Sequence, residues 1–302
     1  MIPDDARAAL REHGYAILPG FLSAADLAPA VGELGLLFPS PDGYHDRTDP
    51  RWERFQGDEF AGIDEFPFAG VELSLLAVHE RLVGLAAELL EEPDLRIYGA
   101  EAWAKYTGAA DYDQELHRDY LAHSLLAPTE DMARQQLELF VYLVDVPEDL
   151  GPLSVVPRRH TRHLPAKPNW YPLRGGYGDQ AGFVAPEGSP DLYAAEIPAT
   201  GPAGTVVAYH PGTFHRGTTL RAPRGARYTL QLLYRPAAAE WAQRRGWAQI
   251  SHEPAWYRFV DRATPGQLAL FGFPPPGHPY WTPEALTATA QRYPNLDLTP
   301  WR

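Results

Sequence analysis

The sequence predicts a mostly β fold, a double-stranded β-helix (jelly roll) flanked by helices on its N-terminal side. After residue 95, short runs rich in Val, Leu, Phe and Tyr recur between Gly and Pro residues, as strands do. No helical pattern separates these runs, which favours antiparallel sheets over parallel ones. Before residue 95, apolar residues recur every three or four positions, as on one face of a helix.

The change from a helical repeat of apolar residues to strand-like runs near residue 95 predicts how the chain is organised. A length of 302 residues suits one domain, residues 1–302, with a core of its own. Within it we expect a helical flank over residues 1–94, a jelly-roll core over 95–235, and a C-terminal extension over 236–302 packed on the core.

The flank should contain three main helices. The first ends at Gly14 and is followed by a strand over residues 15–18. Ser23 and Asp26 form a capping-box pattern that opens the second. Five apolar residues that share one face predict a long third helix, which Pro93 stops: Leu75, Val78, Leu82, Leu85 and Leu89.

The core should contain five strands with long loops between them. We expect the strands at residues 95–104, 137–146, 153–156, 204–209 and 227–235. The segment from 165 to 190 is dense in Pro, Gly and aromatic residues and predicts a long ordered loop over one end of the sheets. Near residues 283–293 the extension should form a helix.

Composition excludes several classes of chemistry. The chain has no cysteine, so disulfides, zinc–thiolate sites, iron–sulfur clusters and thiol nucleophiles are excluded. A net charge of -13 argues against nucleic acid and anionic membrane surfaces as partners. No apolar run reaches the length of about 18 residues that a membrane helix needs, and the first residues lack a secretory pattern. We therefore expect a cytoplasmic protein, and the sequence carries no signal for an oligomeric state.

His117 and Asp119 are the first candidate metal ligands. In a strand, residues i and i+2 point to the same face, so this imidazole and this carboxylate would project together. A His-x-Asp pair also arises by chance at strand ends, so a third ligand is required.

His215 is the candidate third ligand, because a turn after the strand at 204–209 can direct its ring back into the sheets. Two imidazoles and one carboxylate leave three open positions, which favours iron(II) holding a bidentate keto acid together with O2. His210 competes for the same role, and zinc with a hydrolytic water is the chemical alternative.

Arg227 is a candidate carboxylate clamp, because a guanidinium can donate two parallel hydrogen bonds to one carboxylate. Its strand face also carries Thr229 and Gln231, whereas Tyr228, Leu230 and Leu232 point to the other face. Arg221 and Arg224 lie close enough in sequence to replace it.

With these residues in place, the sequence resembles the phytanoyl-CoA hydroxylase (phytanoyl-CoA dioxygenase) family of Fe(II)/2-oxoglutarate-dependent oxygenases. Residues 11–23, REHGYAILPGFLS, are similar to the opening helix and strand of that family, and residues 143–157, LVDVPEDLGPLSVVP, to its central strand pair. The resemblance implies a jelly roll in which His117, Asp119 and His215 hold iron(II).

The resemblance also implies a co-substrate site. Arg227 matches the family arginine that binds 2-oxoglutarate, and Lys105 matches a family lysine that helps to hold it. Glu101 and Phe140 occupy positions resembling others that line this pocket. The implied activity is hydroxylation of a small molecule by O2, with release of succinate and CO2, although desaturation, ring formation and epoxidation use the same kind of site.

This sequence departs from the family pattern at three places. Arg158 and the two residues after it replace a Gly-Ser-His or Gly-Thr-His run, and Gly217 stands where a small hydroxyl residue is common. The interval from His215 to Arg227 is one residue longer than is usual. These departures bear on the co-substrate and the substrate, and they remove no metal ligand.

The substrate pocket is expected to include Tyr120, beside the metal motif, Trp170, in the covering loop, and Arg158, in a basic loop that could meet an anionic group. The net charge favours a free small molecule over a CoA thioester. Two other functions remain open on the same scaffold: a zinc- or manganese-dependent hydrolase or isomerase, and a non-catalytic binding protein.

Overall fold

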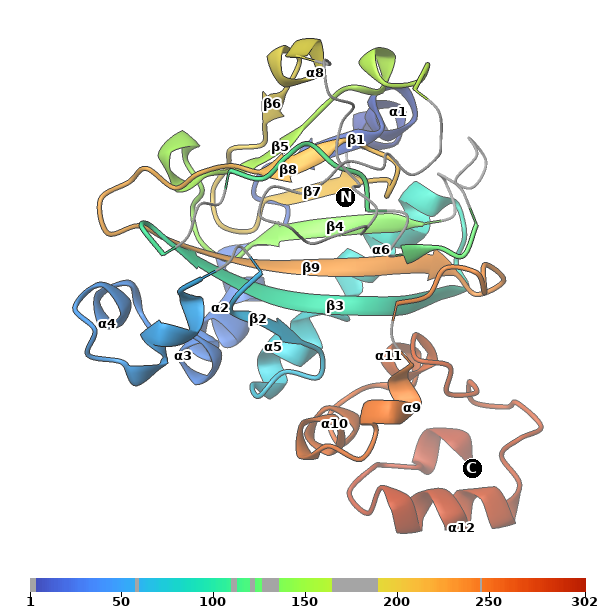
Figure 1. Ribbon diagram of the computed structural model, residues 1–302. Helices are drawn as coiled ribbons and strands as arrows, with labels where there is room; N and C mark the ends of the chain where they lie inside the picture. The colour runs from blue at the N-terminus through green and yellow to red at the C-terminus, as the bar shows by residue number, and fades with distance from the viewer. Residues whose placement is uncertain are drawn as a thin grey trace.

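The computed structural model describes residues 4–57, 60–109, 113–119, 123–126, 136–164, 190–244 and 246–302. Two antiparallel sheets dominate the described chain, and helices surround them (Figure 1). The larger sheet has six strands in the order β1-β7-β4-β9-β3-β2, and the smaller has three in the order β6-β5-β8.

The strands of the larger sheet come from both halves of the chain. They are β1 (Tyr15–Leu18), β2 (Ile63–Glu65), β3 (Leu95–Tyr106), β4 (Leu137–Tyr142), β7 (Val206–Tyr209) and β9 (Ala226–Pro236). The smaller sheet consists of β5 (Leu153–Val155), β6 (Ile197–Pro198) and β8 (His215–Gly217). The five expected strands are confirmed, with ends that differ by a few residues.

The two faces of the larger sheet differ in chemistry. Leu230, Leu232 and Tyr228 of β9 enter the apolar core that the helices complete, as predicted. On the opposite face, Phe140 of β4 and Tyr209 of β7 pack toward the smaller sheet. We call these the outer and the inner face.

Helices of the N-terminal flank cover the outer face (Figure 1). They are α1 (Asp4–His13), α2 (Ala24–Gly32), α3 (Leu34–Leu37), α4 (Pro41–His45), α5 (Val71–Leu76) and α6 (Glu80–Leu90), with the 3-10 helix η1 (Pro50–Phe55). The predicted stop at Gly14, with φ +84°, is confirmed. The capping box is confirmed as well, since the Ser23 hydroxyl accepts from the Asp26 N–H.

The prediction of one long helix between residues 75 and 89 was wrong. The segment forms α5 and α6, because the His79 side chain accepts a hydrogen bond from the Arg81 N–H and so caps a new helix. Leu82, Leu85 and Leu89 are nevertheless buried on one face, so the apolar period predicted the packing but not the break.

The C-terminal extension is more helical than predicted. It contains α9 (Trp247–Ile250), α10 (Pro254–Val260), α11 (Pro265–Ala269), α12 (Pro283–Arg292) and the 3-10 helix η5 (Thr299–Trp301). The helix expected near residues 283–293 is α12. Between the strands lie η3 (Glu148–Leu150), η4 (Arg158–His160) and α8 (Pro190–Ala194). The division into flank, core and extension stays a prediction.

The predicted loop over residues 165–190 lies, but for its last residue, outside the described residues. Among the described residues, no helix has the length and apolar character needed to cross a membrane.

Candidate metal centre

His117, Asp119 and His215 come together at one edge of the smaller sheet. His117 and His215 form an isolated antiparallel bridge, in which each backbone N–H donates to the other residue's carbonyl at 3.0 Å. The Asp119 N–H donates to the Pro211 carbonyl, also at 3.0 Å. The expected strand around His117 is therefore reduced to a single bridge, while β8 positions His215.

The three side chains converge on a small volume. Asp119 Oδ2 lies 3.2 Å from His215 Nε2, and Asp119 Oδ1 lies 3.6 Å from His117 Nε2. One ligand atom of each residue lies within 4.8 Å of the others. This spacing suits one metal ion bound by two nitrogens and one oxygen.

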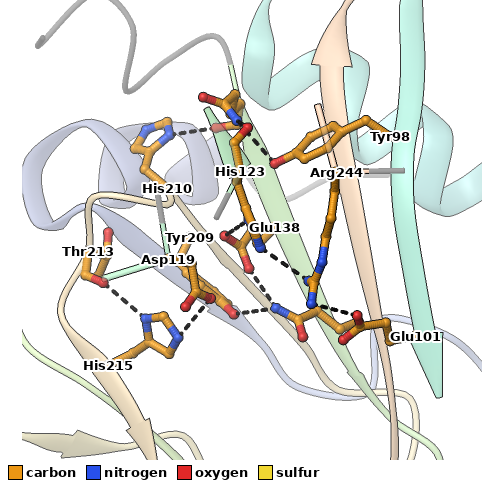
Figure 2. A network of polar contacts seen from close by, with 12 residues as sticks. Tyr98, Glu101, Asp119, His123, Glu138, Tyr209, His210, Thr213, His215 and Arg244 are labelled. Carbon is orange, nitrogen blue, oxygen red and sulfur yellow. Dashed lines mark hydrogen bonds and ion pairs between the residues drawn. The ribbon is translucent and has the colours of Figure 1, made fainter. Parts of the chain in front are cut away.

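Backbone carbonyls orient both imidazoles. His117 Nδ1 lies 2.7 Å from the Glu115 carbonyl oxygen. His215 Nδ1 lies 3.0 Å from the Thr213 carbonyl oxygen (Figure 2). Because a carbonyl only accepts, each Nδ1 carries the proton when the ring is neutral. Each Nε2 lone pair is then free for a metal, which is the usual arrangement of ligating histidines.

The electrostatics of the triad favour a cation. Burial, and after it the neighbouring His215, lower the pKa of His117 to about 4. Burial also opposes charge on His215, but the Asp119 carboxylate raises the pKa of His215 to about 9. In spite of burial, His215 holds the pKa of Asp119 well below its usual range. The triad therefore attracts one positive charge, which a proton or a metal ion can supply.

A second group of possible ligands consists of Asp119, His123 and Glu138, whose ligand atoms also lie within 4.8 Å of one another. His123 is already engaged on both sides, since Nδ1 lies 3.1 Å from Glu138 Oε1 and Nε2 lies 3.1 Å from Arg244 Nη1 (Figure 2). A guanidinium only donates, so Nε2 accepts and Nδ1 donates to Glu138. His123 could ligate a metal only by giving up one of these bonds, so the first triad is the candidate centre.

This polar network extends across the inner face. Gln231 of β9 donates to Glu138 Oε2 at 2.6 Å, and Glu138 is fully buried. Arg244, from the segment after β9, lies 2.7 Å from Glu101 of β3. Trp103 Nε1 also donates to Glu101, at 3.1 Å. Glu101, predicted at the co-substrate site, is therefore an ion-pair partner of Arg244.

Lys105 and Arg227 lie further along the inner face. They are opposite each other in the β3–β9 register, and each is only 3% exposed. Burial raises the pKa of Tyr142 to about 12, and the Arg227 charge opposes this shift, which places the guanidinium near that ring. Phe140 is buried on the same face of β4. The structure thus brings a buried lysine and a buried arginine together at one end of the inner face.

The alternatives named from sequence lie elsewhere. Arg224 is exposed and forms ion pairs with Asp42 and Asp46 at 2.9 and 2.8 Å. His210 Nδ1 contacts the Gln136 carbonyl at 3.1 Å, and His210 belongs to neither group of possible ligands.

Of the three residues predicted for the substrate pocket, the structure describes only Arg158. Arg158 begins η4, which packs against α1. Tyr120 and Trp170 lie outside the described residues.

Sequence reasoning missed Glu138, His123 and Arg244. The sequence did contain a signal for Glu138, which is the only charged residue in the apolar run 137–142. It lies two residues from Phe140, so in a strand both side chains point to the same face. The contacts of His123 and Arg244 join segments far apart in the chain, and no local pattern reports them.

Two antiparallel sheets, with a His–Asp–His triad at the edge of the smaller one, define the class: a protein with a candidate mononuclear metal centre. The chain belongs to the phytanoyl-CoA dioxygenase family, whose sequence profile matches residues 10–227. Arg244 and the helices after it lie beyond that match. Comparison with curated proteins gives no significant match.

Several solved structures share the fold. The epimerase SnoN, in complex with Fe3+, alpha ketoglutarate and nogalamycin RO, is 22% identical with a TM-score of 0.59, covering 83% of this chain and 90% of SnoN. The carbocyclase SnoK from nogalamycin biosynthesis is 19% identical with a TM-score of 0.56, covering 78% of this chain and 85% of SnoK. EctD from S. alaskensis, in its apoform, is 19% identical with a TM-score of 0.54, covering 79% and 78%.

Proposed function

We propose that this chain is an iron(II)- and 2-oxoglutarate-dependent oxygenase that hydroxylates a small molecule. One observation carries the proposal: a convergent His–Asp–His triad stands against the inner face of the larger sheet, which also carries the buried pair Lys105 and Arg227. A hydrolytic metal site has no evident use for two buried cations beside it. A dicarboxylic keto acid does, because one end chelates the metal and the other end carries a negative charge.

The triad residues would hold the metal through His117 Nε2, His215 Nε2 and an Asp119 oxygen, leaving the remaining positions open. Bound iron(II) and 2-oxoglutarate would supply the oxidising chemistry, in which O2 is consumed, succinate and CO2 are released and one oxygen atom goes to the substrate. The chain's own contribution is orientation. The Glu115 and Thr213 carbonyls hold the rings, and the apolar wall that includes Phe140 excludes water.

In this proposal Arg227 binds the distal carboxylate of 2-oxoglutarate with two donors, and Lys105 adds a second positive charge. Glu101 acts through Arg244, which it holds against His123 and so against the metal site. We also propose that the two facing sheets form a jelly roll of the kind the family resemblance implies, in one domain.

The class of substrate is proposed from the neighbours. SnoN was crystallised with nogalamycin RO, and EctD with 5-hydroxyectoine, both small molecules. SnoN and SnoK are described as an epimerase and a carbocyclase, so related folds host outcomes other than hydroxylation. Retention of Asp119 as a third ligand agrees with oxygen transfer.

Anaerobic titration with iron(II) and 2-oxoglutarate tests the proposal. We expect a weak visible charge-transfer band from the chelate in the wild-type protein. It should vanish in His117→Ala and Asp119→Ala and persist in His252→Ala, which removes an exposed histidine of the extension. Metal binding without the band would support a zinc or manganese hydrolase or isomerase, and no metal binding would support a binding protein.

A further inference from the structure

Strand β8 presents a gap beside the Arg227 guanidinium. Gly217 is two residues from His215, so a side chain there would point to the same side as the imidazole. A Cβ on Gly217 would lie 3.8 Å from Arg227 Nη2. The position therefore borders the carboxylate site proposed above, but Gly217 has no side-chain donor to offer it.

The Gln114 side chain occupies this gap. A Cβ on Gly217 would lie 2.8 Å from Gln114 Oε1 and 3.4 Å from Gln114 Cδ. A side chain at position 217 and the present rotamer of Gln114 therefore exclude each other, because 2.8 Å is shorter than real Cβ contacts.

The backbone of Gly217 fixes the Gln114 amide in one orientation. The Gln114 N–H donates to the Gly217 carbonyl at 3.1 Å, and the Gly217 N–H donates to Gln114 Oε1 at 2.8 Å. Since Oε1 accepts this bond, both donors of the amide are on Nε2. No described residue accepts a hydrogen bond from Nε2.

We propose that Gln114 is a positioning residue for the co-substrate, whose Nε2 donates to the distal carboxylate beside Arg227. The inference rests on the proposed function, because it assumes that 2-oxoglutarate binds. A carboxylate has about four acceptor sites and a bidentate guanidinium uses two, so a further donor can be accommodated. Gln114 thus replaces the hydroxyl that Gly217 lacks.

A purely structural role, that of satisfying the Gly217 N–H, makes a different prediction. If that were the whole role of Gln114, removing its side chain would disturb β8 and with it His215, so iron(II) and every keto acid would bind more weakly. Loss of a donor to the distal carboxylate would weaken the binding of only those keto acids that have a distal carboxylate. Pyruvate chelates a metal in the same way but has no distal carboxylate, and it is the matched probe.

The experiment measures the Kd of iron(II), and then of 2-oxoglutarate and pyruvate, by anaerobic calorimetry and by the charge-transfer band. The proteins are wild type, Gln114→Met and Arg227→Met. For Gln114→Met we expect about a tenfold higher Kd for 2-oxoglutarate, the loss of roughly one charge-assisted hydrogen bond, with iron(II) and pyruvate unchanged. Arg227→Met should show the same selectivity with a larger loss.

A rescue variant adds a second criterion. In the double variant Gln114→Ala with Gly217→Ser, the space left by the amide can hold a hydroxyl next to Arg227. It should bind 2-oxoglutarate more tightly than Gln114→Ala alone.

The outcomes separate the two proposals. If wild type binds iron(II) but not 2-oxoglutarate, both the proposed function and this role are wrong. If wild type binds 2-oxoglutarate and Gln114→Met binds it equally well, or loses pyruvate and iron(II) in parallel, only the role of Gln114 is overturned. If Gly217→Ser does not restore 2-oxoglutarate affinity to Gln114→Ala, the inference that Gln114 replaces a hydroxyl at position 217 is overturned.

Discussion

The two faces of strand β9 carry different kinds of residue within the same eleven positions. Leu230 and Leu232 on the outer face are fully buried among apolar side chains. Arg227 and Gln231 on the inner face are also almost completely buried, but among charged and hydrogen-bonding groups. Burial alone therefore does not distinguish the two faces. Apolar contact stabilises one face, whereas the other must satisfy each polar atom that it removes from water.

The largest expected effect is on the outer face. Leu230→Ala removes a fully buried side chain and leaves a cavity, so we expect the free energy of unfolding to fall by about 2–5 kcal/mol. Urea denaturation measures this loss. Iron(II) affinity of the molecules that remain folded should be unchanged. A weaker metal site in folded Leu230→Ala would mean that the two faces are not independent.

The neighbouring inner-face residue offers a matched test without a cavity. Gln231→Leu keeps the volume but leaves fully buried Glu138 without its 2.6 Å donor, which should lower the free energy of unfolding by about 1–3 kcal/mol. Denaturation under the same conditions as for Leu230→Ala allows a direct comparison. Stability equal to wild type would show that the Gln231–Glu138 hydrogen bond contributes nothing to folding.

The smallest effect is expected in α2, in the helical layer over the outer face. Hydrogen bonds from Ser23 and the Arg81 charge lower the pKa of Asp26 in the folded protein. Ionised Asp26 therefore stabilises the fold above its unfolded pKa of about 3.9, and this contribution is lost as the pH falls through the lower folded pKa.

Asp26→Asn should consequently be less stable at neutral pH, by at most about 1 kcal/mol. The difference from wild type should close at acid pH, which thermal unfolding over a pH series can follow. A constant difference at every pH would assign the effect to geometry instead of charge.

The contrast between faces also explains what could be predicted from sequence. Outer-face residues such as Leu82 and Leu230 follow the period of their own helix or strand, so local pattern predicted their burial. The triad was predicted because strand parity and the family resemblance pointed to the same residues. The ion pair between Arg244 and Glu101, the tautomer of His123 and the fit of Gln114 against Gly217 depend on contacts between distant segments, which periodicity does not encode. The break before α6 was missed because a capping histidine outweighed a continuous apolar stripe.

Arg244 has a consequence for anyone who would recombine this chain with its relatives. It belongs to the segment beyond residues 10–227, yet its guanidinium neutralises Glu101 inside that region and meets His123 beside the candidate metal centre. A chimera that exchanged the C-terminal extension alone would bury the Glu101 carboxylate without its counter-ion. The extension must therefore be exchanged together with Glu101 and His123. A chimera boundary placed at the end of the family match would separate Arg244 from both residues.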